Sequence, residues 1–438
     1  MIKAGKVCFG LVLWAVLSFS GNADTGTRSE KNTLAKVQLS SGMPLIYQQD
    51  TSSRITVLQF SIAGGQFAEP PDKSGLSYLS TRMTLVLPDR SKTQTIMGQA
   101  TQLLMTGRAD YSLVSIACLS DNLEDSLKVV SEIMRNPLLS GIRINHAKEQ
   151  MGRQIKSLRD DSENTAHQTA VELLFPGTGY ARSIYGTEDS IKSIKKKDIR
   201  KFFDSHFRPG NMTAMVCSDL DMETVVRLLD EHFNKFPSGS PPARSEFYLP
   251  EIHSRTKTIE RSTRQTLVGM AYRLPPLNAR RYAGAFLLEH VLGKGIGSKL
   301  WPLRDEKKLA YHVNARMEYF REGGVMEVYL ETESGKKEAA EAELEAVMNK
   351  IYSEGVGKEE WESILNYALA SFLRSNETKQ QRVQTISFFE MTGLGSSFFH
   401  GILKEMKNIS WEAFNMFLRN VLNPENRVSI LIGPGVSK

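Results

Sequence analysis

Two side chains in the second half of this 438-residue chain, Arg304 and Tyr311, are of the types that stabilise developing negative charge. A guanidinium and a phenol hydroxyl aimed at a polarised carbonyl oxygen can each supply roughly 3 kcal/mol of transition-state stabilisation. Each residue also has an ordinary interpretation, because an arginine suits the negative end of a helix dipole and a tyrosine is common in strands. The pair alone leaves both interpretations open.

The residues around this pair predict how it is held. Residues 283–292 have the apolar pattern of a helix, and three glycines between residues 293 and 297 then predict a flexible turn. The spacing of Leu300 and Leu303 predicts a second, short helix, and a strand should begin near residue 310. The arginine is therefore expected at the end of a helix and the tyrosine at the start of a strand.

This segment resembles the carboxy-terminal half of the M16 (pitrilysin or insulinase-like) metallopeptidase family. In that family a glycine-rich turn, Ser-x-Leu and Leu-Arg-x-x-x-x-Leu-Ala-Tyr follow one another, and residues 293–311 contain all three. Gly-Thr-Glu-Asp-Ser-Ile at residues 186–191 and Phe-Arg-Pro-Gly-Asn at residues 207–211 extend the resemblance to the first half. The resemblance implies that Arg304 and Tyr311 bind no metal but hold the substrate backbone and the oxyanion at a zinc site.

The zinc motif of that family, His-x-x-Glu-His, is degenerate in this chain. Tyr78 stands at the first histidine, Thr81 at the glutamate and Arg82 at the second histidine. Zinc needs neutral imidazoles at i and i+4 with a carboxylate beside them as base, whereas a guanidinium repels a dication. The third ligand of the family, a glutamate further along the chain, falls near Glu163 and Asn164. We expect no metal to be bound by this chain, because no two of its eight histidines stand at helical ligand spacing.

An internal repeat defines the fold class. Phe-x-Pro-x-Asn at residues 207–211 and Leu-x-Pro-x-Asn at residues 422–426 are 215 residues apart, and both precede a strand. The stretch 56–65 likewise matches 266–275. A repeat of this length is a domain duplication, and strands and helices that do not alternate strictly predict an α+β fold. We expect two homologous α/β-sandwich halves, each an antiparallel sheet with helices packed on one side, and the resemblance implies that they face each other as a clamshell.

The predicted boundaries follow composition. Residues 24–236 form the first domain, residues 237–262, which begin Pro-Ser-Gly-Ser-Pro-Pro, form a linker, and residues 263–438 form the second domain. Within the first domain we expect helices over residues 75–85 and 92–104.

The amino terminus predicts export. Lys3 and Lys6 precede an apolar run over residues 7–19, and small residues then offer a cleavage site before Asp24. Residues 1–23 are therefore predicted to be a secretory signal peptide. No later stretch approaches about 20 apolar residues, so we expect a mature chain without a membrane anchor, secreted across the inner membrane into the periplasm.

The charge of the chain is mildly basic. It is +6 in full and +4 without residues 1–23. The densest basic run, residues 192–201, carries isoleucines at helical spacing and no interleaved aromatic residues. A solvated helix face is the favoured interpretation over a nucleic-acid surface, so we expect no nucleic-acid partner.

Two cysteines remain after removal of the signal peptide. Cys118 and Cys217 each lie in a strand-like run. An oxidising compartment would permit a disulfide if the two strands are neighbours, and two buried free thiols are the equal alternative.

Two functional hypotheses follow. In the first, the chain is no peptidase alone but the non-catalytic subunit of a heterodimeric M16-type zinc peptidase, in which a partner with His-x-x-Glu-His holds the zinc and Arg304 and Tyr311 act on the peptide substrate. In the second, it is an inert clamshell that binds peptides or serves assembly. An independent hydrolase with unrecognised residues is the least favoured alternative, since the chain has no Gly-x-Ser-x-Gly motif and no convincing Cys/His pair.

Overall fold

The computed structural model describes residues 33–434, apart from residues 238, 240, 241, 243–246, 294 and 296. The predicted signal peptide, residues 1–23, lies outside the described residues. None of the helices in the described ranges combines the length and the apolar character that a membrane span needs.

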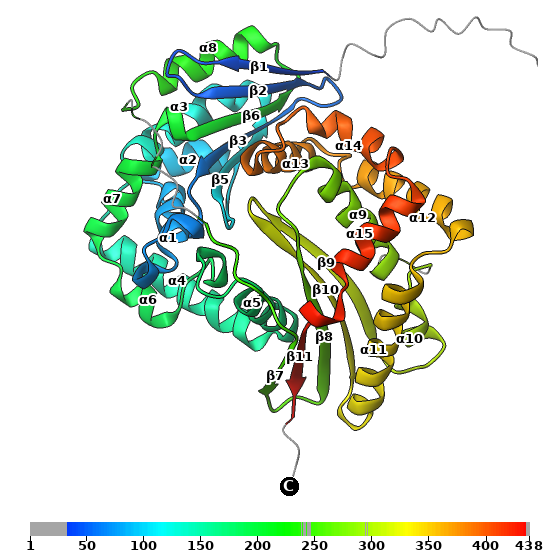
Figure 1. Ribbon diagram of the computed structural model, residues 1–438. Helices are drawn as coiled ribbons and strands as arrows, with labels where there is room; N and C mark the ends of the chain where they lie inside the picture. The colour runs from blue at the N-terminus through cyan, green and yellow to red at the C-terminus, as the bar shows by residue number, and fades with distance from the viewer. Residues whose placement is uncertain are drawn as a thin grey trace, which may run out of the picture.

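The first half of the chain builds a six-stranded sheet (Figure 1). The strand order is β1-β2-β6-β3-β5-β4, and all neighbours are antiparallel except the parallel pair β2 and β6. The central strand β3 is buried along nearly its whole length. The strands are β1 (Leu34–Gln38), β2 (Pro44–Gln49), β3 (Ile55–Ala63), β4 (Gln102–Gly107), β5 (Tyr111–Leu119) and β6 (Met212–Ser218).

The second half repeats this topology. Its five-stranded sheet has the order β7-β11-β8-β10-β9, again with one parallel pair, β7 and β11. The order β11-β8-β10-β9 corresponds to β6-β3-β5-β4 of the first sheet, which confirms the duplication and the α+β class. The strands are β7 (Arg255–Glu260), β8 (Gln265–Leu274), β9 (His312–Phe320), β10 (Gly323–Glu333) and β11 (Val428–Gly433).

Helices of each half cover one face of their own sheet. In the first half α3 and α8 pack on the sheet through leucines, valines and phenylalanines, while α1 packs with α4 and α7 in a neighbouring apolar cluster. In the second half α9, α11, α12, α14 and α15 cover the sheet. The bounds are α1 (Leu76–Arg82), α2 (Arg90–Gly98), α3 (Leu123–Arg135), α4 (Gly141–Asp160), α5 (Ser162–Leu174), α6 (Glu188–Ser193), α7 (Lys196–His206), α8 (Met222–Phe233), α9 (Ala279–Gly293), α10 (Trp301–Asp305), α11 (Lys337–Glu354), α12 (Lys358–Arg374), α13 (Lys379–Thr392), α14 (Phe398–Lys407) and α15 (Trp411–Val421).

The structure corrects two boundaries. The helix predicted over residues 92–104 ends at Gly98, and the chain turns at Ala100, which has a φ of 52°, before β4 begins at Gln102. Apolar residues at 103–105 had imitated a helical pattern, although they belong to an edge strand paired with β5. Strand β7 lies at residues 255–260, so the second sheet begins inside the predicted linker, residues 237–262.

The other face of each sheet is covered by a helix from the opposite half. Helix α5 of the first half packs on the second sheet, and α13 of the second half packs on the first sheet (Figure 1). The two helices stand at equivalent places in the repeat, so the exchange is reciprocal. Helix α5 contributes Ala166, Ala170, Val171 and Leu174 against Leu267, Ala271, Val428 and Ile430, and α13 contributes Val383 and Ile386 against Ile46, Val57 and Met215.

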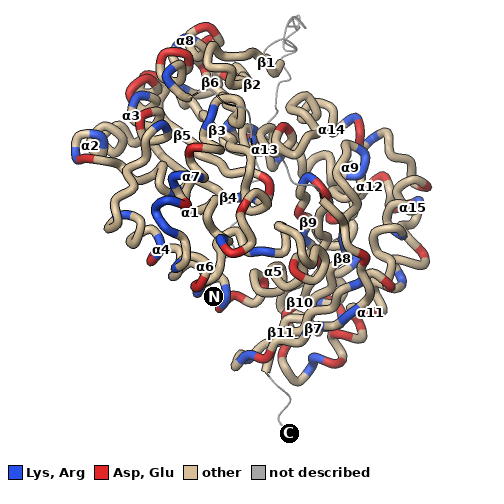
Figure 2. Tube along the Cα trace, turned by 60° about the vertical axis from the view of Figure 1, so that its left-hand side comes forward, with Lys and Arg blue, Asp and Glu red and all other residues tan. Residues whose placement is uncertain are grey.

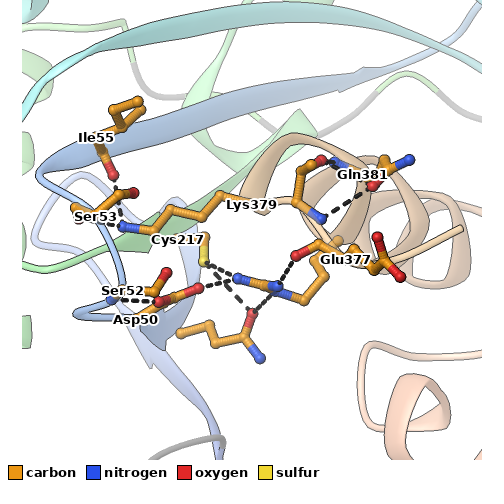
Figure 3. A network of polar contacts seen from close by, with 11 residues as sticks. Asp50, Ser52, Ser53, Ile55, Cys217, Glu377, Lys379 and Gln381 are labelled. Atoms are coloured by element: carbon orange, nitrogen blue, oxygen red, sulfur yellow. Dashed lines mark hydrogen bonds and ion pairs between the residues drawn. The ribbon is translucent and has the colours of Figure 1, made fainter. Parts of the chain in front are cut away.

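Polar contacts fix α13 on the first sheet (Figure 3). Lys379 is buried, and its Nζ donates to the carbonyl oxygens of Ser53 and Ile55, each at 2.8 Å. Arg382 forms an ion pair with Asp50 and donates through Nε to Gln48 Oε1 at 3.1 Å. Burial alone would raise the pKa of Asp50, but hydrogen bonds from residue 52 and the charge of Arg382 outweigh burial and hold that pKa below its usual value.

The two cysteines are free thiols. Cys118 pairs with Thr56 and Cys217 with Val57, which is the next residue of β3. Successive residues of a strand point to opposite faces, so the thiols lie on opposite faces of the sheet and cannot form a disulfide. Burial raises the pKa of Cys118 to about 11.

We predict that Arg382→Ala lowers the free energy of unfolding by about 3 kcal/mol, because Asp50 would remain a mostly buried charge without its partner. The side chains of Arg382 and Asp50 are only 14% and 15% exposed. Denaturant unfolding measures the loss. A matched control is Arg54→Ala, since the Arg54–Asp121 pair is 74% and 68% exposed and should contribute less than about 1 kcal/mol. Equal losses in the two variants would contradict the role of the buried pair.

Candidate functional site

A buried carboxylate fixes the start of α1. Glu69 accepts hydrogen bonds from the backbone N–H groups of Gly75 (3.0 Å) and Ser77 (2.7 Å). Burial raises the pKa of Glu69 to about 8, against the opposing effect of these two hydrogen bonds. Gly75 has a φ of 90°, and a Cβ atom there would stand 2.7 Å from the carbonyl oxygen of Tyr185. Glu69 and Gly75 therefore fix the start of α1 at Leu76, and this start determines the direction in which its side chains point.

The three residues at the degenerate zinc motif are hydrogen-bonded within the protein. The Tyr78 hydroxyl donates to Gln154 Oε1 at 3.1 Å, and the Arg82 guanidinium donates to Gln150 Oε1. Tyr78 and Arg82 are one turn apart on α1, and the two glutamines are one turn apart on α4. Thr81 is fully buried, and its hydroxyl donates to the carbonyl oxygen of Ser77 at 2.9 Å. The hydroxyl groups of Tyr78 and Thr81 and one side of the Arg82 guanidinium are therefore already hydrogen-bonded within the protein.

This arrangement does not fit zinc. Within the part of the chain that the structure describes, no three His, Cys, Asp or Glu side chains gather closely enough to hold a metal ion. A phenol and two neutral amides are weak donors for zinc, and Arg82 adds a positive charge. Glu163, near which the third ligand was expected, lies on α5 and accepts a hydrogen bond from the Tyr329 hydroxyl at 2.7 Å. The α4 side chains that accept hydrogen bonds from Tyr78 and Arg82 are instead Gln154 and Gln150.

Arg304 and Tyr311 both reach solvent. Arg304 lies in α10, and its guanidinium carbon is 5.1 Å from the ring centre of Trp301. Tyr311 directly precedes β9, is 57% exposed, and donates its hydroxyl to Glu333 Oε1 at 2.6 Å. This hydrogen bond, together with the negative charge of Glu333, raises the pKa of Tyr311. The two side chains contact different partners, so the structure does not join them into one cluster.

A three-residue ion cluster connects α5 to the second sheet. His167 Nε2 lies 2.8 Å from Glu318 on β9, and its Nδ1 lies 2.8 Å from Glu327 on β10. Burial alone would lower the pKa of His167, but the charges of Glu327 and Glu318 outweigh burial and raise it to about 10. Burial would raise the pKa of Glu318, but the charges of His167, Arg316 and Arg108 lower it to about 2. The histidine is therefore a cation between two carboxylates at neutral pH.

The hairpin turns of the two halves meet at a second junction. Asp110, between β4 and β5, accepts hydrogen bonds from the Tyr180 hydroxyl and from the backbone N–H of Arg321, both at 2.8 Å. Arg321 lies between β9 and β10, the equivalent turn of the second half. One buried carboxylate thus holds the two turns together.

A cavity of about 300 Å³ lies beside this junction. Its walls come from both halves and carry Arg108, Glu318, Tyr319 and Gln384. The lining of this cavity contains a cation, a carboxylate and hydroxyl groups. It can therefore both donate hydrogen bonds to a polypeptide segment that enters between the halves and accept hydrogen bonds from it.

Comparison with known proteins places the chain in a family. The sequence model of the insulinase family, peptidase family M16, matches residues 45–188, and that of the peptidase M16 inactive domain matches residues 193–367. The chain belongs to the M16 family. The match to the inactive-domain model and the likeness to a non-peptidase homolog make it an inactive M16 homologue.

Individual M16 proteins agree with this placement. The non-peptidase homolog YmxG of Helicobacter pylori is 22% identical over 384 residues, which cover 86% of this chain and 88% of that protein. The M16 inactive domain from Pseudomonas fluorescens has the same fold, with a TM-score of 0.84 at 18% identity over 93% of this chain and 99% of that one. The periplasmic protease PqqL of Escherichia coli gives a TM-score of 0.75 at 15% identity, over 92% of this chain but 47% of PqqL.

Sequence reasoning missed several residues of this M16 homologue. The sequence indicates Gln150 and Gln154 only weakly, as polar residues next to the buried Met151 and Ile155 of the same helix. It does not indicate His167, because both of its carboxylate partners belong to the other half of the chain.

We predict that the M16 zinc site can be restored at this place. Tyr78→His, Arg82→His and Gln154→Glu together supply two imidazoles and a carboxylate from facing helices, so the variant should retain about one zinc ion per chain. Metal analysis after dialysis measures it. Tyr78→His alone is the control and should retain none. A triple variant that is folded but metal-free would show that α4 does not face the ligand position.

We predict a pH-dependent contribution of His167 to stability. The folded pKa of about 10 lies above the unfolded value of about 6.5, so the contribution is complete below about pH 6.5 and is lost as the pH rises towards 10. On the acid side it is lost as the pH falls from about 4.5 towards about 2, the folded pKa of Glu318. His167→Gln should cost about 3 kcal/mol at pH 6, because it leaves Glu327 buried without its cation. It also removes one of the cations beside Glu318, which keeps Arg316 at 3.3 Å.

Unfolding of this variant is measured at several pH values against His312→Gln. His312 pairs with Glu163, and their side chains are 49% and 39% exposed, so the control should change stability by less than about 1 kcal/mol. A cost of His167→Gln that does not vary between pH 6 and 10 would contradict the cationic state.

Proposed function

We propose that the mature chain is exported to the periplasm and is the non-catalytic subunit of a heterodimeric M16-type zinc peptidase. The partner subunit contributes His-x-x-Glu-His and the zinc ion. This chain contributes Arg304 and Tyr311, which bind the peptide substrate and stabilise the oxyanion. The family membership and the loss of the zinc motif support a chain that completes another subunit's site.

The exposure of the pair is the observation that carries the proposal. Arg304 is exposed and stacks on Trp301, and Tyr311 is 57% exposed. An arginine and a tyrosine in a purely structural position would be expected to form ion pairs or to pack in the core. Here both functional groups remain accessible to a second protein.

The environment of Tyr311 supports its role as a hydrogen-bond donor. Its hydroxyl holds its proton, since the contact with Glu333 raises the pKa of the phenol. On substrate binding the hydroxyl would turn from Glu333 to the carbonyl oxygen of the scissile peptide bond. A phenol that donates in this way stabilises negative charge as it develops on that oxygen.

The likeness to PqqL supports assembly from two subunits. This chain shares the fold of 47% of that periplasmic protease. In the proposed heterodimer the zinc-binding subunit supplies the counterpart of the remaining part.

The test is peptide hydrolysis in the presence of zinc by this chain alone, by a His-x-x-Glu-His subunit alone, and by both together. Activity is expected only in the mixture. Arg304→Ala or Tyr311→Phe should then lower kcat/KM by about tenfold to a thousandfold, because each removes a donor to the transition state.

Matched controls are Arg374→Ala, which removes an exposed arginine stacked on Tyr367, and Tyr248→Phe, which removes the hydroxyl of a tyrosine that is 81% exposed. Both should leave the rate unchanged. Full activity of the mixture with both Arg304 and Tyr311 substituted would refute the proposal, and an inert mixture would favour the alternative of a clamshell that binds peptides or serves assembly.

A further inference from the structure

The net positive charge of the chain is concentrated in one segment. Residues 192–208 contain seven lysines and arginines and two aspartates, a net charge of +5. The mature chain predicted from residue 24 has a net charge of +4, so all its other residues together amount to −1. The charge is therefore a local property of this segment, which contains the end of α6 and the whole of α7.

The fold presents these cations on one outer surface. Helix α7 buries Ile199, Phe202 and Phe203 in the cores of the first half, so its charged residues point away from the protein. Figure 1 shows α7 at the outer edge of the first half, and Figure 2 shows the basic residues gathered beside it. We call this surface the basic face, which consists of Lys192, Lys195, Lys196, Lys197, Arg200, Lys201 and Arg208.

The basic face is poorly neutralised by the protein itself. Lys192 and Arg200 are 3.7 Å and 4.0 Å from aspartates, at the outer limit of an ion pair. Among the described residues, no carboxylate lies within ion-pair distance of Lys196, Lys197 or Lys201. Like charges held close together on a rigid helix repel one another, and a partner with negative charge relieves this repulsion.

A hollow beside α7 gives the partner access. It is lined by Lys197, Arg200, Lys201 and Arg208 together with Asp204, so cations outnumber acids four to one in its charged lining. An anionic group that enters this hollow can contact several cations at once. Lysines on a convex helix surface would each contact such a group separately.

We propose that the basic face binds the anionic surface of a phospholipid membrane. Five of its seven cations are lysines, compact charges that suit a layer of phosphate groups, whereas carboxylate recognition favours the arginine fork. Phe202 and Phe203 are buried, so the face offers no aromatic platform for the stacking of nucleic-acid bases. The cations are spread over the outside of two helices, which matches a broad surface.

This orientation leaves the second half free. In Figure 1 α7 and the second half lie on opposite sides of the molecule. A chain held on a membrane by α7 therefore keeps Arg304 and Tyr311 accessible to another protein. The inference itself does not depend on the proposed peptidase role.

The experiment is co-sedimentation of the mature full-length chain with vesicles of phosphatidylcholine alone and with vesicles in which about a third of the lipid is phosphatidylglycerol. Binding is expected only to the anionic vesicles and should weaken as salt is raised, because surface charges are screened. Each cation near such a surface strengthens binding about fivefold. The triple variant Lys196→Gln, Lys197→Gln, Lys201→Gln should therefore bind about 100-fold more weakly.

The matched control is Lys358→Gln, Lys404→Gln, Lys407→Gln, which removes the same charge from exposed positions in the second half and should bind as the unmodified chain does. Equal weakening in both variants would overturn the proposal, since net charge and not the basic face would then be responsible. Absence of vesicle binding would overturn it too, and binding of poly-glutamate or duplex DNA in its place would assign the face to an acidic protein or to nucleic acid.

Discussion

Each sheet of this protein can bury its second face only with a helix supplied by the other half of the chain. The central strands β3 and β8 are buried on both faces, and the helices of each half cover only one of these faces. The reciprocal exchange of α5 and α13 solves this problem for both sheets at once. The two halves are therefore two sheets within one cooperative structure, even though the sequence repeats as if they were separate domains.

The exchange also explains where the strongest polar contacts lie. Lys379 and Arg382 belong to α13 and bind the first sheet, while His167 belongs to α5 and binds the second. Each of the two exchanged helices, α5 and α13, thus contributes both an apolar face and a buried charge to the sheet of the other half. Ion pairs withdrawn from water are costly unless each charge is matched, so these contacts favour one register of helix on sheet over its neighbours. They fix how the halves stand relative to each other, and hence the cavity between them.

Much of the fold could be predicted from sequence because its signals are local. The helical pattern over residues 283–292 and the Pro-x-Asn turns at residues 209–211 and 424–426 depend on neighbours in the chain. The register that separates Cys118 from Cys217 depends on strand pairing. Equally, the glutamines that accept hydrogen bonds from Tyr78 and Arg82 come from α4, three helices further along the chain. Contacts between residues far apart in the sequence produce no periodic pattern, so only the structure reveals them.

The same distinction applies to the candidate site. The spacing of Leu300 and Leu303 predicted α10, which contains Arg304, and the strand expected near residue 310 is β9, which begins directly after Tyr311. Sequence could not show that Trp301 stacks on the arginine or that Glu333 accepts a hydrogen bond from the phenol hydroxyl. The contact with Glu333 raises the pKa of Tyr311, and the two contacts decide how the side chains are held at the surface.

The matched pairs Tyr78–Gln154 and Arg82–Gln150 have an evolutionary consequence. A single reversion to histidine on α1 would break one side-chain contact without gaining a metal, and the abandoned glutamine would face a partly buried space alone. Several changes on two helices must therefore occur together before any of them is beneficial. The two hydrogen bonds between α1 and α4 therefore oppose the formation of a zinc site by single substitutions.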